Sequence, residues 1–214
     1  MFGHDRCRDR RMTLIALGAG CLLSTAAPAA TIGFDGLPVG APFTGDTRDG
    51  FTVAPVSGVW SVNGYGAPGP SLVSVDERGV GGQTFGLAVT RGGGTFTFDA
   101  VDLYSSVTPI PYALLGTLGG RTVFDASGTV PNTFGAFATV PGPAATAAID
   151  RLEVTLTTVA LSPAIGSNPY GIDNVAVSAV AAPVPEVPSL WLLAPALAAL
   201  GGAWQGRVSR RSPG

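Results

Sequence analysis

The chain has 214 residues, of which 31 are glycine and 18 are proline, and only 12% are charged. This composition excludes a coiled coil, a highly charged disordered chain and a basic nucleic-acid-binding protein. It favours a β protein whose strands are separated by glycine and proline turns, with apolar segments near the two ends of the sequence.

Residues 1–30 have the three parts of an export signal. Four arginines within residues 6–11 precede an uncharged apolar run over residues 14–23. Ala27, Pro28 and Ala29 then match the small-residue pattern of a cleavage site, and the apolar run is short for a permanent membrane helix. We expect residues 1–29 to be a signal peptide. An N-terminal buried helix is the alternative.

Residues 30–180 are expected to form one all-β domain, a two-sheet β-sandwich of the jelly-roll type. Polar and apolar residues alternate with the period of two that is typical of half-buried strands, and turn signals such as Asn63-Gly64 separate the runs. No run of ten residues has a helical period. The predicted strands are 31–35, 51–54, 59–62, 71–75, 84–90, 94–98, 101–105, 112–118, 121–125, 134–140, 152–157 and 172–178.

Two strands change phase within their apolar pattern. Apolar residues are three positions apart, instead of two, between Phe98 and Val101 and again after Ile172. Such a step turns the following side chains to the opposite face of the sheet unless one extra residue is accommodated. We therefore predict β-bulges at residues 99–100 and 173–174.

The expected domain lacks most of the residue types that carry catalysis. Residues 31–182 contain five arginines, eleven acidic residues and no lysine, for a formal charge of −6. The only histidine, His4, and the two cysteines, Cys7 and Cys21, lie in the export signal. Disulfides, zinc or copper sites, Schiff-base chemistry and activated Ser-His or Cys-His nucleophiles are thereby excluded from the domain. Its acidity disfavours nucleic acid as a partner.

Pairs of neighbouring acids raise the alternative of a glycan-active enzyme. A glycosidase needs two carboxyl groups that face each other across a cleft, one of them with a raised pKa. Neighbours on glycine-rich turns rarely meet this requirement, so we expect solvated turn carboxylates and no enzymatic activity. The pairs are Asp46 and Asp49, Asp76 and Glu77, and Asp99 and Asp102.

Aromatic residues around a tight turn raise the alternative of sugar binding. Trp60 and Tyr65 flank Asn63, whose amide could hydrogen-bond sugar hydroxyls while the rings stack on the sugar. Tyr104 is a further aromatic candidate. The favoured interpretation, however, places Trp60 in the core and makes Tyr65 a loop contact.

The segment from Tyr170 to Val175 reads Tyr-Gly-Ile-Asp-Asn-Val. It resembles the closing strand of many jelly-roll carbohydrate-binding modules and their secreted relatives, in several of which an aspartate there and an acid near the first strand help to bind structural calcium. The resemblance implies that Asp173 and Asp35 are calcium ligands, a role that suits carboxylate oxygens. The alternative is that both aspartates only accept backbone hydrogen bonds in turns.

Residues 181–189 are expected to form a proline-rich linker, and residues 190–214 a transmembrane sorting helix with an arginine tail. Three prolines make the linker an extended spacer, and residues 190–204 are uncharged and largely apolar. Arginines beyond a membrane helix stay on the cytoplasmic side, so the β domain would lie outside. A buried C-terminal helix is the alternative.

This tail resembles the PEP-CTERM sorting signal of Gram-negative bacteria, although Val187 stands where the family has its second proline. The resemblance implies recognition by an exosortase, which is a membrane transpeptidase. It also implies export through the inner membrane to the cell surface or to an exopolysaccharide-containing biofilm matrix. The residues that carry the resemblance are Val184, Pro185, Glu186, Pro188, Arg207, Arg210 and Arg211.

The sequence therefore favours an exported, non-enzymatic protein of the cell surface or extracellular matrix, with no cofactor except possible structural calcium. A carbohydrate-binding module for a matrix polysaccharide is the alternative function. Ice binding, a label attached to similar tails, is less favoured because no regular Thr-x-Thr array recurs across successive strands. A glycan-active enzyme is also less favoured, for want of a suitable carboxylate pair.

Overall fold

The computed structural model describes residues 29–64, 69–76, 80–134, 136–143, 147–162 and 165–180. These residues form strands and turns, and they include no helix that is long and apolar enough to cross a membrane. The expected signal peptide before Ala29, the linker and the sorting tail lie outside the described residues. Those three expectations therefore stay predictions.

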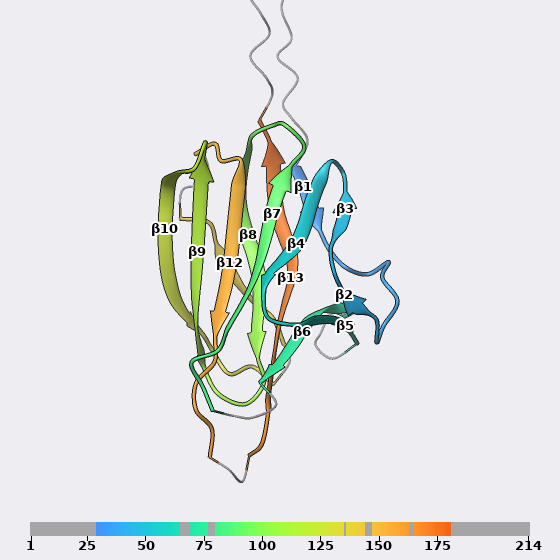
Figure 1. Ribbon diagram of the computed structural model, residues 1–214, viewed down its shortest axis with the longest axis vertical. Helices are drawn as coiled ribbons and strands as arrows, with labels where there is room; N and C mark the ends of the chain where they lie inside the picture. The colour runs from blue at the N-terminus through green and yellow to red at the C-terminus, as the bar shows by residue number, and fades with distance from the viewer. Residues whose placement is uncertain are drawn as a thin grey trace, which may run out of the picture.

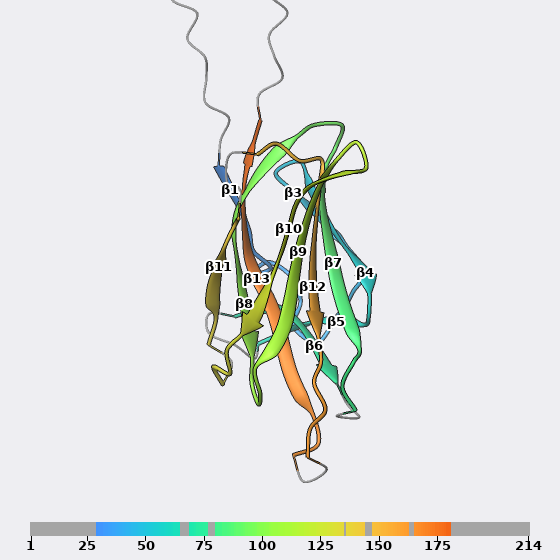
Figure 2. The same ribbon diagram turned by 90° about the vertical axis from the view of Figure 1, so that its left-hand side faces the viewer.

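Two antiparallel sheets pack face to face, so the described part is an all-β sandwich, as the alternation predicted (Figure 1; Figure 2). One sheet has the order β11-β8-β13-β6-β5-β2, with β1 also paired to β13, and the other has the order β10-β9-β12-β7-β4-β3. From β6 onward, successive strands alternate between the sheets except at the β9–β10 hairpin. The strands are β1 (Ala29–Ile32), β2 (Pro42–Phe43), β3 (Asp46–Arg48), β4 (Phe51–Ser57), β5 (Trp60–Asn63), β6 (Ser71–Asp76), β7 (Thr84–Arg91), β8 (Phe96–Ser105), β9 (Ile110–Leu118), β10 (Arg121–Val130), β11 (Ala138–Pro141), β12 (Arg151–Thr157) and β13 (Asn168–Ala179).

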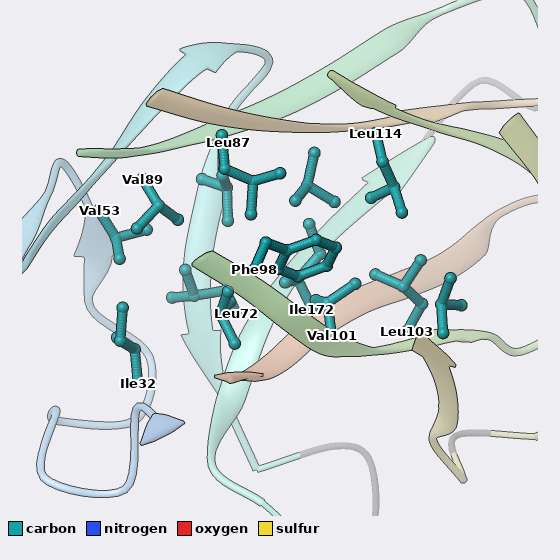
Figure 3. Close-up of a cluster of buried hydrophobic side chains, with 14 of the residues drawn as sticks. Ile32, Val53, Leu72, Leu87, Val89, Phe98, Val101, Leu103, Leu114 and Ile172 are labelled. Atoms are coloured by element: carbon teal, nitrogen blue, oxygen red, sulfur yellow. The ribbon is translucent and has the colours of Figure 1, made fainter. Parts of the chain in front are cut away.

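The core lies between the two sheets and is made of the inward-facing half of each strand. On β12, Leu152, Val154 and Leu156 are buried and the residues between them are half-buried, which is the period-two pattern. Figure 3 shows aliphatic side chains from both sheets meeting around Phe98. Truncating one such leucine to alanine costs about 2–5 kcal/mol in comparable cores.

The β8–β13 pair contains both predicted bulges. From the Asp173–Asp102 pair to the Ala176–Ala100 pair, β13 advances three residues and β8 two. At the next pair β8 advances two residues and β13 one, so the second irregularity compensates for the first. The apolar residues on both sides of the bulges consequently face the core.

The strand predictions were wrong in two places. The short edge strands β2 and β3 were not predicted, because two or three residues are too few to show a period. The strand expected over residues 134–140 is confined to β11, and Phe134 lies in a turn before it. The remaining predicted strands overlap observed ones.

The two ends of the sandwich differ in what they hold. Ala29 pairs with Ser178, so the described chain begins and finishes at the same end. The opposite end, here called the distal end, is where Tyr170 pairs with Ser105 and where β9 begins and β10 finishes (the lower end in Figure 1). Its described segments are residues 80–84, 105–110, 130–134 with 136, 157–162 and 165–168.

Candidate functional site

Two regions contain groups that the packing of the core does not explain. The first, here called the Gly33 notch, consists of Gly33, Asp35, Asp173 and Asn174. A methyl group built on Gly33 would lie 3.4 Å from Asn174 Oδ1, 3.7 Å from Asp35 Oδ2 and 3.9 Å from Asp173 Oδ1. Three side-chain oxygens from the two ends of the domain sequence therefore converge beside one glycine.

Asp173 has the least favourable environment of the notch residues. It is 2% exposed, and its Oδ1 has no hydrogen-bond partner among the described residues. Burial raises the pKa of this carboxyl from 3.8 to about 6; a hydrogen bond from the Asn174 backbone lowers it, the charges of Asp35 and Asp102 raise it, and a hydrogen bond from the Phe34 backbone lowers it. A buried, partly unsatisfied carboxylate destabilises the fold unless a cation or proton compensates it.

The bulge in β13 sets the direction of the Asn174 amide. Asn174 has a φ of 45°, and its Nδ2 donates to Asp102 Oδ2 at 3.0 Å. Thr139 Oγ1 in turn donates to Asp102 Oδ1 at 2.6 Å. Because Asp102 takes the NH₂ group, the amide oxygen of Asn174 is turned toward Gly33.

The donor set of the notch suits calcium, which prefers carboxylate, amide and backbone oxygens. Two carboxylates and one amide surround the space beside Gly33. The described residues contain no group of three or more His, Cys, Asp or Glu side chains that could hold a metal ion. A calcium ion here would therefore depend on Asn174 and on backbone or water oxygens as well as on the two aspartates.

Trp60, one of the residues considered for sugar stacking, lies in the core. Trp60 is 1% exposed, its Nε1 donates to Ser57 O at 3.1 Å, and its ring packs edge-on against Phe85. Its stacking role is thus corrected to core packing, the favoured alternative, because a ring enclosed by both sheets presents no face to a ligand. Asn63 is half-buried at the end of β5, and Tyr65 lies outside the described residues.

Tyr104 is also buried. Its ring packs edge-on against Phe137 at a centroid distance of 4.9 Å and covers Gly171, where an added Cβ would lie 2.3 Å from Tyr104 Cε1. Gly171 is thus required by close packing on this outer face of the sheet. Neither ring face of Tyr104 is open to a sugar.

The second region is the distal end, which holds an exposed aromatic ring that the sequence analysis missed. Phe134 is 80% exposed and has a φ of 52°, a conformation that side chains with a Cβ adopt at a cost of roughly 1–2 kcal/mol. It is the only aromatic residue among the exposed large hydrophobic residues of the described part. The alternation of Phe134, Ala136, Ala138 and Val140 hid it within a predicted strand, although Pro131-Asn132 is a turn signal.

Buried polar side chains hold the loop of Phe134 in place. Asn168, 2% exposed, donates from Nδ2 to Ser105 Oγ at 2.9 Å and accepts from the Val107 backbone N–H at 2.8 Å. Asn132 donates from Nδ2 to Val107 O at 2.8 Å and accepts from the Phe134 N–H at 3.3 Å. These bonds join three distal segments and end on the backbone N–H of the strained residue, so a polar network holds the backbone of the Phe134 loop.

The strand register reveals a row of threonines that the sequence pattern did not show. It crosses the outward face of the second sheet, one residue per strand, and a single arginine interrupts it. On the next parallel row the corresponding residues include Ala88 and Glu153, so no Thr-x-Thr array forms there. The row consists of Thr47, Thr52, Thr90, Arg151, Thr117 and Thr122.

The acidic pairs considered for catalysis do not form a cleft among the described residues. Asp46 makes an ion pair with Arg48 at 2.6 Å, and Asp49 lies in a turn with a φ of 51°. Asp99 accepts a hydrogen bond from Ser178 at 2.9 Å, and Asp102 belongs to the notch network. The side chains of Asp76 and Glu77 are not among those described.

One depression of about 360 Å³ lies beside Trp60. Its lining is mainly apolar, with Phe43, Pro55 and Val59 among the residues, and it contains no carboxylate. This depression therefore lacks the paired acids that glycoside hydrolysis needs.

Comparison with known proteins finds similarity only at the level of solved structures. Neither a protein family nor a curated protein sequence matches this chain. A family 29 carbohydrate-binding module from Piromyces equi is similar with a TM-score of 0.41 and 11% identity, over 71% of this chain and 91% of that one. A variant of a second family 29 module, complexed with mannohexaose, has a TM-score of 0.42 and 13% identity, over 72% and 92%.

A third similar structure is TmCBM61 in complex with β-1,4-galactotriose. Its TM-score is 0.38 and its identity 10%, over 69% of this chain and 94% of that one. These structural neighbours are carbohydrate-binding modules. At such identities the similarity assigns no role to any residue of this chain.

Proposed function

We propose that residues 30–180 form a non-catalytic, jelly-roll-like carbohydrate-binding domain of an exported protein. The observation that carries the proposal is Phe134, whose ring is exposed and whose backbone, at a strained φ, donates a hydrogen bond to Asn132. An exposed aromatic ring on an ordered backbone offers apolar contact to the C–H face of a sugar, with little further loss of backbone entropy on binding. A strained, exposed and well-anchored residue indicates binding more than folding, because folding alone gains nothing from it.

A polysaccharide array probed with the full-length chain tests this function. Retention on at least one glycan is expected, and Phe134→Ala should weaken it. Failure of the correctly folded chain to bind any polysaccharide on the array would contradict the proposal.

Calcium is the proposed structural cofactor of the domain. Asp35, Asp173 and Asn174 would hold it, and the ion would supply the positive charge that the buried Asp173 carboxylate lacks. The supporting observation is the unsatisfied Asp173 Oδ1 at the meeting point of two other side-chain oxygens. Such an ion would tie the exit of β1 to the middle of β13.

Export and surface sorting complete the proposal and rest on sequence features alone. The signal-like N-terminus and the PEP-CTERM-like tail support passage through the inner membrane and exosortase processing, followed by residence at the cell surface or in the matrix. Replacing Val184, Pro185 and Glu186 by alanine should leave the protein in the inner membrane. Unchanged surface display of that variant would contradict sorting by this motif.

A further inference from the structure

The distal end faces away from the point where the described chain begins and finishes. Ala29 and Ser178 pair at one end of the sandwich, whereas Ser105, Asn168 and Val130 lie at the other (Figure 1). A domain attached to a surface through residues near Ala179 would hold its distal end farthest from the attachment. This end is therefore the part that first meets a large ligand.

The distal segments are fastened to one another as well as to the strands. Besides the network of Asn168 and Asn132, the Gly82 N–H donates to Thr158 O at 2.8 Å and the Gln83 N–H to Thr158 Oγ1 at 3.1 Å. Since residues 158 and 168 belong to one connection, all four distal connections are linked by hydrogen bonds to a neighbour. The surface that carries Phe134 is consequently preorganised.

Three exposed apolar side chains belong to the distal segments. Phe134, Val80 and Ile165 are 80%, 60% and 52% exposed, respectively. Ser162 is exposed and Ser167 half-buried beside Ile165, so hydroxyl groups accompany the apolar side chains. Apolar faces next to hydroxyls match the amphipathic surface of a sugar ring.

The distal segments carry no excess of positive charge. The described residues of segments 80–84, 105–110, 130–136, 157–162 and 165–168 include no Arg, Lys, His, Asp or Glu. Asp76, Glu77 and Arg78, which precede residue 80 in the sequence, have a net charge of −1. Recognition of an acidic polysaccharide would be favoured by guanidinium or ammonium groups in excess of carboxylates, and the distal segments have no such excess.

We propose that the distal end is the sugar-binding surface and that it selects a neutral polysaccharide over an acidic one. The inference rests on the proposed carbohydrate-binding function and adds the ligand class and the location. Phe134 stacks on the apolar face of a sugar residue, and the adjacent connections contact its neighbours along the glycan.

Affinity electrophoresis of the full-length chain tests both additions. Native gels contain a neutral polysaccharide (glucomannan or xyloglucan) or an acidic one (alginate or polygalacturonate), at equal mass and physiological ionic strength. We expect retardation by a neutral glycan and little by the acidic ones.

Phe134→Ala should weaken the retention constant by roughly tenfold or more, as for a central aromatic contact, whereas Phe134→Trp should preserve it. Leu118→Ala, which removes a 41% exposed side chain at the opposite end, is the matched control.

The outcomes separate this inference from the proposed function. Retention by acidic glycans equal to or stronger than that by neutral ones overturns the neutral selectivity but leaves carbohydrate binding intact. Neutral-glycan retention that survives Phe134→Ala, in a variant with unchanged thermal unfolding, overturns the distal location. Absence of retention by every glycan overturns both.

Discussion

The Gly33 notch and the distal end contain locally unfavourable features of opposite kinds. In the notch, the buried Asp173 carboxylate has an oxygen without a partner and two negative charges nearby. At the distal end, Phe134 is solvent-exposed and has an unfavourable backbone conformation, with a φ of 52°. The first cost is electrostatic and the second is conformational.

Because of this difference, the stabilities of the two regions respond to different perturbations. Protons and cations change the free energy of the notch, because they neutralise Asp173. Neither affects Phe134, whose strain depends on its φ and on the hydrogen bonds that hold it. The comparison can therefore be tested one region at a time.

The largest expected effect is an inverted pH dependence from Asp173. Its pKa is about 6 when folded and 3.8 when unfolded, so the folded state binds the proton more tightly. In the absence of calcium, its contribution to the free energy of unfolding is full below pH 4 and is lost as the pH rises through 6, by on the order of 3 kcal/mol.

Denaturant unfolding in a chelator between pH 4 and 7 measures this loss. Asp173→Asn is the control, since the amide cannot ionise, and Asp35 and Asp102 remain as the neighbouring acids. The free energy of unfolding of the wild type, measured relative to that of Asp173→Asn, should fall as the pH rises. A difference that does not vary with pH would show that the carboxyl is not perturbed.

Calcium should have the next largest effect. At a hundredfold excess over its dissociation constant, a ligand of the native state adds about 2.7 kcal/mol, or roughly 5–10 °C for a domain of this size. Gly33→Ala should abolish the shift, because its methyl group would fill the space between the three oxygens. The same variant should unfold normally in chelator, since every contact of the methyl group is 3.4 Å or longer.

Thermal unfolding with millimolar calcium and with chelator measures this response. The shift should shrink at pH 5, where protonation of Asp173 competes with the cation. If millimolar calcium does not change the unfolding temperature at pH 7, the calcium proposal is wrong, and the distal-end proposal is unaffected.

Asn168→Ala should perturb the distal end by about 2 kcal/mol. The substitution leaves the Val107 N–H and Ser105 Oγ without their shared partner, at roughly 1–3 kcal/mol for buried groups. Glycan retention should weaken as well, although Asn168 is buried, because the Phe134 loop loses its anchor. Ser178→Ala removes a hydrogen bond at the opposite end and should leave retention unchanged. Full retention by Asn168→Ala would argue against preorganisation.

The smallest and most diagnostic effect is a gain of stability from Phe134→Gly. Glycine relieves the strain at a φ of 52° but adds freedom to the unfolded chain, so a net gain of about 0.5–1 kcal/mol is expected. Asp49→Gly, at a φ of 51°, is the control and should give a smaller gain, because aspartate adopts a positive φ more readily than phenylalanine. Only Phe134→Gly should lose glycan retention. A loss of stability in Phe134→Gly would mean that the ring contributes to folding.

Local patterns predicted most of the fold, since alternation and phase are written into consecutive residues. The step of three after Phe98 predicted a bulge because only an extra residue returns Val101 to the core, and the register confirms it. Short edge strands such as β2 escaped prediction because two residues carry no period. Phe134 was assigned to a strand because the alternation of Phe134, Ala136, Ala138 and Val140 looks the same whether or not a sheet partner exists.

The sequence by itself determined the sandwich, its two bulges and the lack of His, Cys and Lys chemistry in the domain, because these depend on residue type and on spacing along one strand. The tertiary structure alone decided which groups meet. It enclosed Trp60, brought Asp35 to within reach of Asp173, and turned Phe134 outward at the end opposite Ala29. Such outcomes depend on contacts between segments far apart in sequence, where register and packing, rather than local preference, set the distances.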